Sequence, residues 1–116
     1  MLKHAKDYSS NEVEHLVGGK GSATVQPYFE PTEFGGSHVK FCSLVSVHPS
    51  GEIGWHRHDG EDEVYLFQKG HGTVNDDGVI KEVKPGDSML IGRGQSHSVT
   101  NTGDVDLELI AVIVTY

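Results

Sequence analysis

The chain has 116 residues, with nine basic and 17 acidic side chains, and a formal net charge of −8 when its eight histidines are neutral. Nucleic acids and anionic membranes are bound through basic faces, so this charge argues against either as a partner. A single cysteine, Cys42, excludes an internal disulfide and fits a reducing compartment. The first residues, MLKHAKDYSSNEVEH, contain no signal-peptide core, and no apolar stretch has the roughly 20 residues that cross a bilayer. We therefore expect a soluble cytoplasmic protein.

Short β-rich runs separated by Gly, Pro, Asn or Asp recur along the chain. The best helical candidate, residues 10–16, is short and its apolar stripe does not continue. Strands are predicted over residues 23–29, 38–47, 63–68, 73–75, 79–83, 88–92, 96–101 and 107–116. Eight or more short strands indicate an antiparallel sandwich or a small barrel. No linker or composition shift interrupts the pattern, so we expect one domain over residues 1–116, with residues 1–22 as an N-terminal extension or edge strand.

The last strand, Leu107–Tyr116, is apolar on both faces apart from Glu108. A strand that is apolar on both sides is covered on both sides. In one small sandwich the extra cover can come from a second subunit, so we predict a homodimer. The alternative is a central strand that the protein's own loops cover.

Two histidines stand one residue apart in the segment GWHRHDGEDEVYLFQKG, residues 54–70. Residues i and i+2 of a strand point to the same face, so His56 and His58 project together while Trp55 and Arg57 point away. Imidazoles gathered inside a small barrel need a metal, water or a carboxylate as partners. Neutral imidazole is the commonest protein metal ligand, although a short motif of this kind also arises by chance.

A further histidine, His97, follows about forty residues later, after a glycine-rich turn in GDSMLIGRGQSHSVTN. Together the two segments closely resemble the signature motifs of the cupin superfamily. The first motif, about residues 51–70, is matched by Gly51, His56, His58, Glu63 and Gly70. The second, about residues 86–101, is matched by Gly86, Gly94, His97 and Asn101.

The sequence departs from these motifs in two places. Gly51 lies one residue closer to the first histidine than in the commonest form. Gly92 replaces the usual proline of the second motif, which affects the stiffness of that turn and not the histidine after it.

The resemblance implies an all-β fold, a double-stranded β-helix or jelly roll, of the small single-domain cupin type. It also implies that one metal ion is bound by His56, His58, Glu63 and His97, the alternative being an ancestral site that has lost its metal. Three imidazoles and a carboxylate suit a divalent transition metal, namely Mn, Fe, Co, Ni, Cu or Zn. Around an octahedral ion they leave two positions for substrate and for O₂ or water. A purely structural zinc would more often be bound by cysteines.

Other residues near the motifs have weaker assignments. Tyr65 and Phe67 share the strand parity of Glu63 and should line the cavity. Tyr65 is a weak candidate for substrate contact or proton transfer, and Glu63 could act as an acid or base only if it left the metal. Asn101 either supports the site by hydrogen bonding or serves the turn NTGD.

The neighbouring acids Glu61 and Asp62 are assigned to a solvated turn, from which either could gate the barrel mouth. We expect Cys42, Met89, Leu90 and Ile91 in the core. The remaining histidines are expected at the surface or at edges; they are His4, His15, His38, His48 and His71.

The leading functional hypothesis is a small metalloenzyme that acts on a small organic molecule bound through two oxygens. Dioxygenase-like oxidation or decarboxylation is favoured over sugar isomerisation. A second class is a non-catalytic, metal-dependent module that binds or senses a small ligand. A cupin-type sugar isomerase is the third, but it would need a cationic phosphate pocket, and the chain offers only Arg57, Arg93 and lysines that lie mostly in turns.

Overall fold

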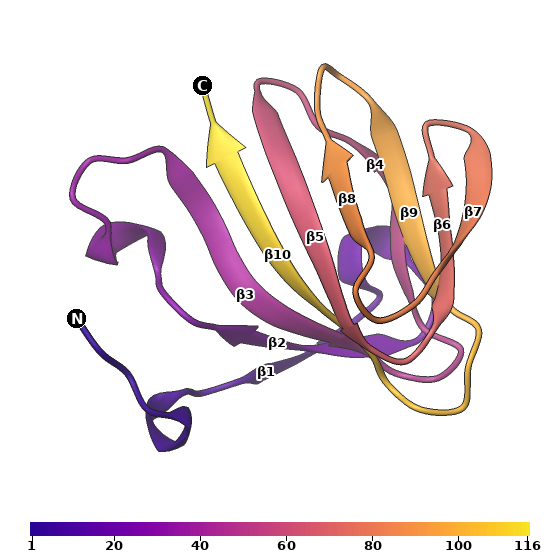
Figure 1. The fold of residues 1–116 in the computed structure, drawn as a ribbon, viewed down its shortest axis with the longest axis horizontal. Helices are drawn as coiled ribbons and strands as arrows, with labels where there is room; N and C mark the ends of the chain where they lie inside the picture. Colours follow the sequence, from indigo (N-terminus) through magenta and orange to yellow (C-terminus); the bar gives the residue numbers. More distant parts are fainter.

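Ten strands and three single-turn 3₁₀ helices make up the fold (Figure 1). The computed structural model describes residues 1–116. The strands are β1 (Asn11–Glu14), β2 (Ser22–Pro27), β3 (Val39–Val47), β4 (Glu52–Arg57), β5 (Glu61–Lys69), β6 (Gly72–Asp76), β7 (Val79–Val83), β8 (Ser88–Ile91), β9 (Ser96–Asn101) and β10 (Leu107–Thr115). The 3₁₀ helices are η1 (Ala5–Asp7), η2 (Leu16–Gly18) and η3 (Pro31–Glu33).

The strands form two antiparallel sheets, one in the order β1-β2-β3-β10-β5-β8 and one in the order β4-β9-β6-β7. Within them β3 pairs with β10, β4 with β9, β5 with β8 and β6 with β7. Among the eight strands from β3 to β10, the first thus pairs with the last, the second with the next to last, and so on inward. This is the pairing of a jelly roll, so the predicted all-β, double-stranded β-helix fold is confirmed.

Side chains alternate along each strand between the core and the outer surface, as period-two geometry requires. In β5 the odd-numbered Tyr65 and Phe67 are buried, and in β10 Leu107 and Leu109 are fully buried. Burial of each such large side chain contributes about 1.5–3 kcal/mol. Thirteen buried apolar residues from both sheets form one core.

Three local predictions are wrong. Residues 11–14, placed in the helical candidate, form the edge strand β1, because they pair with β2. Cys42 is only half-buried and Leu90 is 67% exposed, so neither belongs to the core. Both are even-numbered residues of strands whose odd-numbered residues face inward, and they lie on the outer surface of the six-stranded sheet.

Apolar side chains form two rows across this outer surface. Strand register places Leu66 beside Ile110 and Ile110 beside Leu44. The neighbouring row consists of Leu90, Val64, Val112 and Cys42. We call these seven residues the outer apolar face; all of them are half-buried or exposed in the single chain.

Two glycines allow the backbone of the helix η2 to pack directly against β4. A Cβ on Gly54 would collide with the carbonyl oxygen of Val17, and a Cβ on Gly19 would lie 2.6 Å from the carbonyl oxygen of Glu52. Val17 itself has φ 52°, a strained value for a β-branched residue. The close contact therefore fixes the position of η2 beside the barrel.

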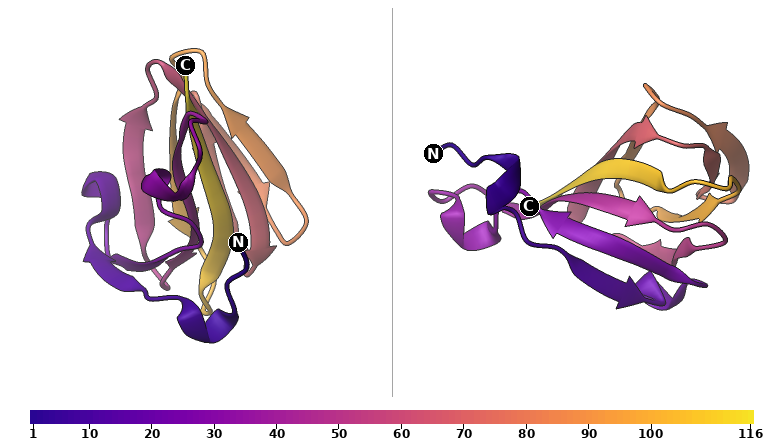
Figure 2. Two further views of the ribbon diagram at one scale, coloured as in Figure 1. Left: turned by 90° about the vertical axis from the view of Figure 1, so that its left-hand side faces the viewer. Right: turned by 90° about the horizontal axis from the view of Figure 1, so that it is seen from below.

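The N-terminal residues and η3 lie at one end of the molecule, and β6 and β7 lie at the other (Figures 1 and 2). No helix in the structure has the length and apolar character needed to cross a bilayer.

Candidate metal centre

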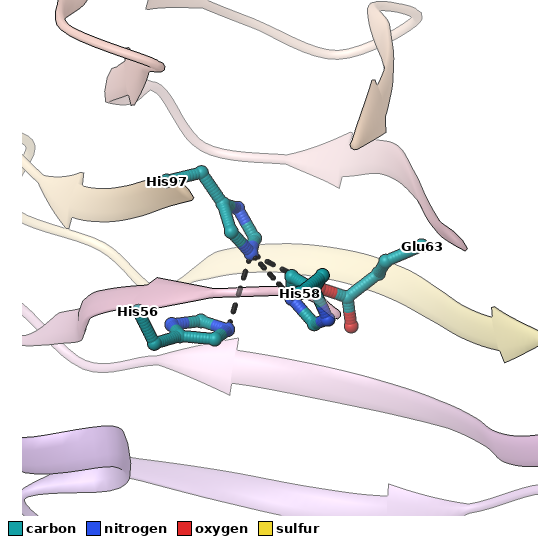
Figure 3. Close-up of side chains that lie close together, drawn as sticks. All are labelled: His56, His58, Glu63 and His97. Carbon is teal, nitrogen blue, oxygen red and sulfur yellow. Dashed lines mark hydrogen bonds and ion pairs between the residues drawn. The ribbon is translucent and has the colours of Figure 1, made fainter. Parts of the chain in front are cut away.

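The four predicted ligand residues come together between the two sheets (Figure 3). His56 lies near the end of β4, His58 just after it, His97 in β9 and Glu63 in β5. The β4–β9 register places His56 directly opposite His97, while Glu63 reaches them from the other sheet. One ligand atom from each residue lies within 4.8 Å of all the others. We call these four residues the His/Glu cluster.

The distances within the His/Glu cluster are compatible with four ligands of one ion. Nε2 of His97 lies 2.9 Å from Nε2 of His58, 3.1 Å from Nε2 of His56 and 3.2 Å from Oε1 of Glu63. Nε2 of His58 lies 3.0 Å from the same carboxylate oxygen. With metal–ligand bonds of about 2.1 Å, ligands at right angles are about 3.0 Å apart and tetrahedral ligands about 3.4 Å apart. The four distances between 2.9 and 3.2 Å fit ligands at right angles around one ion.

The outer nitrogens of two rings determine where the protons lie. Nδ1 of His56 donates to the carbonyl oxygen of Gly54 at 2.6 Å, and Nδ1 of His58 donates to Oε1 of Glu61 at 2.8 Å. A carbonyl and a carboxylate oxygen only accept, so both protons sit on Nδ1, and each Nε2 of the neutral ring carries a lone pair.

These lone pairs face a third histidine and a carboxylate, His97 and Glu63, which are both buried. His97 can offer at most one Nε2 proton in the neutral form, which cannot satisfy His56, His58 and Glu63 together. Oε1 of Glu63 and Nδ1 of His97 are buried without a hydrogen-bond partner. A bound cation would satisfy the converging lone pairs and the carboxylate, so the donor set fits a metal.

Burial and neighbouring charges shift three pKa values near the His/Glu cluster. Burial lowers the pKa of His56, which favours the neutral ring that binds metal. The hydrogen bond from Lys40 holds the pKa of Glu61 below its usual range, so this carboxylate stays charged. Burial, and then the charge of Glu63, raise the pKa of Tyr65 well above its usual range, so its hydroxyl stays protonated.

An apolar cavity of about 140 Å³ opens onto His56 and Glu63. Tyr65 lines it, with its ring centroid 5.2 Å from that of His97, as its strand parity predicts. Phe67 does not line the cavity and packs in the core behind Tyr65, with the two ring centroids 6.1 Å apart.

Asn101 serves the scaffold. Its Nδ2 donates to the carbonyl oxygens of Val47 and Val105, each at 2.8 Å, and its Oδ1 accepts from the Gly103 amide at 2.9 Å. The carboxamide thus ties the turn between β9 and β10 to β3, which supports the turn alternative over direct contact with the His/Glu cluster.

The two acids assigned to a solvated turn lie instead in β5 and are half-buried. Glu61 contacts His58, and Oδ1 of Asp62 accepts a hydrogen bond from the hydroxyl of Tyr116 at 3.0 Å. Sequence reasoning therefore missed Glu61 as the partner of a candidate ligand. Its position three residues after His58 was the available signal.

Comparisons with known proteins agree with this architecture. A family model described as a cupin domain matches residues 43–113. A protein of Thermotoga maritima named oxalate-binding protein is 30% identical over 114 residues, a match that covers 98% of this chain and 93% of that protein.

Solved structures extend the comparison. A Thermotoga maritima crystal structure described as a predicted oxalate decarboxylase is 28% identical, with a TM-score of 0.94 and complete coverage of both chains. The cupin domain of Schizosaccharomyces pombe Cnp3 has a TM-score of 0.73 at 15% identity, over 93% of this chain and 70% of that one, and so shares the fold.

Proposed function

Because this chain belongs to the cupin family, we propose that its His/Glu cluster binds one divalent transition-metal ion and presents it to a small organic oxyanion. One observation carries the proposal: two histidine lone pairs and a buried carboxylate converge on His97, which has at most one proton to share among them. The donor set suits Mn, Fe, Co, Ni, Cu or Zn.

A bound ion of this kind would polarise a ligand oxygen and stabilise negative charge that develops there. The chain's own residues would orient the ligands of the metal, exclude water and bind the organic ligand. Glu61 orients His58, and the apolar side chains of the cavity exclude water from the ligand. Tyr65 supplies a hydroxyl that can donate a hydrogen bond to a ligand oxygen.

The residues of the cavity favour dioxygenase-like oxidation or decarboxylation. Isomerisation of a sugar needs a base that moves a proton between carbons, and the only carboxylate in the cavity is Glu63, which is assigned to the metal. A sugar phosphate would also need a cation, but the lining contains no lysine or arginine. Arg57 is exposed and pairs with Asp59 at 2.7 Å.

The second candidate is metal-dependent capture of a ligand without turnover. It is favoured by the absence of any acid or base in the cavity beyond His56, Glu63 and Tyr65. The name of the Thermotoga maritima relative also refers to binding. On this alternative the ligand is a small carboxylate that leaves unchanged.

An assay of turnover separates the two candidates. The chain is loaded with Mn²⁺ or with Fe²⁺ and given small 2-oxo acids and oxalate, while O₂ consumption and CO₂ release are followed. Catalysis predicts repeated turnover per chain that Tyr65→Phe slows without loss of metal. Capture predicts stoichiometric binding and complete recovery of unchanged ligand.

We also propose that two copies associate through the outer apolar face. Its seven residues lie in two adjacent rows on the central strands of the six-stranded sheet, where a soluble monomer would normally carry polar side chains. A face without charged residues at its centre can meet its own copy without placing like charges in contact, although each chain carries a net charge of −8. This contact would cover the outer side of β10.

A further inference from the structure

The cavity beside the His/Glu cluster is formed by segments distant in sequence. Phe41 and Val45 of β3, with Ala111 and Ile113 of β10, line it from one sheet, and Ile53 of β4 lines it from the other. Eight of its ten lining residues are hydrophobic; the remaining two, His56 and Glu63, belong to the cluster itself. The cavity therefore has one polar end and apolar walls.

Leu16 and Val17 of η2 also line the cavity, and Val17, which is 48% exposed, marks its solvent side; we call these two residues the rim. The strained φ of Val17 and the close approach of its carbonyl oxygen to Gly54 fix this rim against β4. Apolar side chains thus extend from the His/Glu cluster to the opening.

No basic side chain is available to balance charge inside the cavity. Lys40 is paired with Glu61 at 2.8 Å, and Arg57 is paired with Asp59 at 2.7 Å. A ligand can therefore place its negative charge only at the metal end. A second carboxylate directed into the cavity would be buried among hydrocarbon walls without a partner, which is costly.

The volume of the cavity sets the size of the apolar part of the ligand. An apolar cavity of about 150 Å³ accommodates benzene, which has six heavy atoms. The cavity here, at about 140 Å³, is of the same size. Oxalate has no apolar atoms with which to fill it.

From this we infer that the site selects a mono-anionic chelating ligand, such as a 2-oxo acid, with an aliphatic or aromatic body of up to about six heavy atoms. The inference rests on the proposed metal function and adds the substrate class. A site of this kind differs from one that is specific for compact dicarboxylates.

Calorimetric titration of the full chain loaded with Mn²⁺ tests the inference. The ligands are pyruvate, 2-oxobutanoate, 2-oxopentanoate and 2-oxohexanoate, which share one chelating head. Affinity should rise about fourfold with each methylene, about 60-fold across the series. The doubly charged 2-oxopentanedioate, equal in length to 2-oxopentanoate, should bind at least about tenfold more weakly than it.

Variants of the cavity wall assign the effect to these residues. Ala111→Val fills part of the cavity and should flatten the rise of affinity with chain length, with metal content measured in the same samples. Val17→Thr keeps the shape of the rim but replaces one methyl with a hydroxyl, and should reduce the rise. The matched control Val79→Thr, on β7 and 57% exposed, should leave it intact.

Each outcome has a distinct meaning. If the chain holds no metal, the proposed function and this inference fail together. If metal is bound but affinity is flat along the series, or 2-oxopentanedioate binds as tightly as 2-oxopentanoate, the inference is overturned and the metal function stands. If metal is bound and none of these ligands binds, the inference is also overturned and the metal function stands.

Discussion

The carboxylate of Glu61 accepts a hydrogen bond from Nδ1 of His58 at 2.8 Å, while Nε2 on the other side of the same ring points into the His/Glu cluster. Lys40 donates to the second carboxylate oxygen of Glu61, also at 2.8 Å. The hydrogen-bonded chain from Lys40 through Glu61 to His58 thus fixes the orientation and the proton position of His58, one of the candidate ligands. Such partners hold a metal-binding histidine in the tautomer that the metal requires.

Replacement of Glu61 should weaken metal binding. Glu61→Ala removes the acceptor of His58, and loss of such a partner lowers metal affinity by about 10–100-fold. Glu61→Gln keeps an acceptor oxygen without the charge and should fall between the wild type and alanine. Competition with a chelator of known affinity measures the effect.

The neighbouring acid supplies the control for this prediction. Asp62→Asn changes the same charge one residue away, but Asp62 contacts Tyr116 and not a candidate ligand. Metal affinity should therefore stay within about twofold of the wild type. Equal losses in Glu61→Ala and Asp62→Asn would mean that net charge alone, and not orientation of His58, sets the affinity.

Gly54→Ala should destabilise the fold and displace η2. The added methyl would collide with the carbonyl oxygen of Val17 and lie 2.7 Å from the amide nitrogen of Gly19. Overpacking of this kind costs about 1–3 kcal/mol, and each kcal/mol lowers Tm by about 4–8 °C in a domain near this size. Thermal unfolding followed by circular dichroism measures the change.

Gly35→Ala is the matched control, because no atom lies within 4 Å of its added methyl. Its Tm should remain that of the wild type. A Gly54→Ala variant with an unchanged Tm would show that η2 is not held closely against β4.

His48 should make stability depend on pH. Its Nδ1 lies 2.9 Å from Asp106 and its Nε2 lies 2.7 Å from Glu12, so both nitrogens favour the protonated ring. The hydrogen bond with Asp106 is the main cause that raises the pKa of His48. A raised pKa in the folded state stabilises the protein below the unfolded pKa of about 6.5, and this stabilisation is lost as pH rises through the folded value.

The variant His48→Gln isolates this effect. Its Tm should lie furthest below that of the wild type at about pH 6 and approach it at higher pH, because the glutamine side chain does not titrate. His71→Gln, at an exposed histidine, should show no such convergence. A constant Tm difference at every pH would show that protonation of His48 does not stabilise the fold.

A charge on the outer apolar face should separate a dimer. We expect the wild type to sediment at twice the 12.6 kDa of one chain. Leu66→Glu and Leu90→Glu, whose native side chains are 38% and 67% exposed, should sediment as folded monomers. Ile80→Glu, at a 64% exposed residue of the other sheet, should remain dimeric. A monomeric wild type would contradict the proposed association.

The candidate ligands could be predicted from strand alternation together with the resemblance to the cupin motifs. Alternation along strands brings His56 to one face of β4, and motif spacing selects Glu63 from among three neighbouring acids. The same local pattern could not distinguish Leu90 or Cys42 from core residues. In β8 the run Met89–Ile91 is apolar on both faces, so periodicity does not indicate which face is inward. In β3 each face mixes apolar and polar residues, so a small apolar side chain such as Cys42 fits either face.

Features that depend on distant contacts could not be predicted. The cavity combines η2, β3, β4, β5 and β10, which meet only in the folded chain. Asn11–Glu14 contain one apolar residue, Val13, and become a strand because β2 supplies the hydrogen-bond partners. The positive φ of His15 and Val17 has no signal in residue type, since neither is glycine.

Elemental analysis of untagged protein tests the central claim most directly. We expect close to one transition-metal ion per chain, its loss in His58→Ala, and its retention in His71→Ala, where the histidine lies outside the His/Glu cluster. Removal of the metal by a chelator should also lower Tm, because an ion that binds only the folded chain stabilises it. A full complement of metal in a variant that lacks both His56 and His97 would contradict the account.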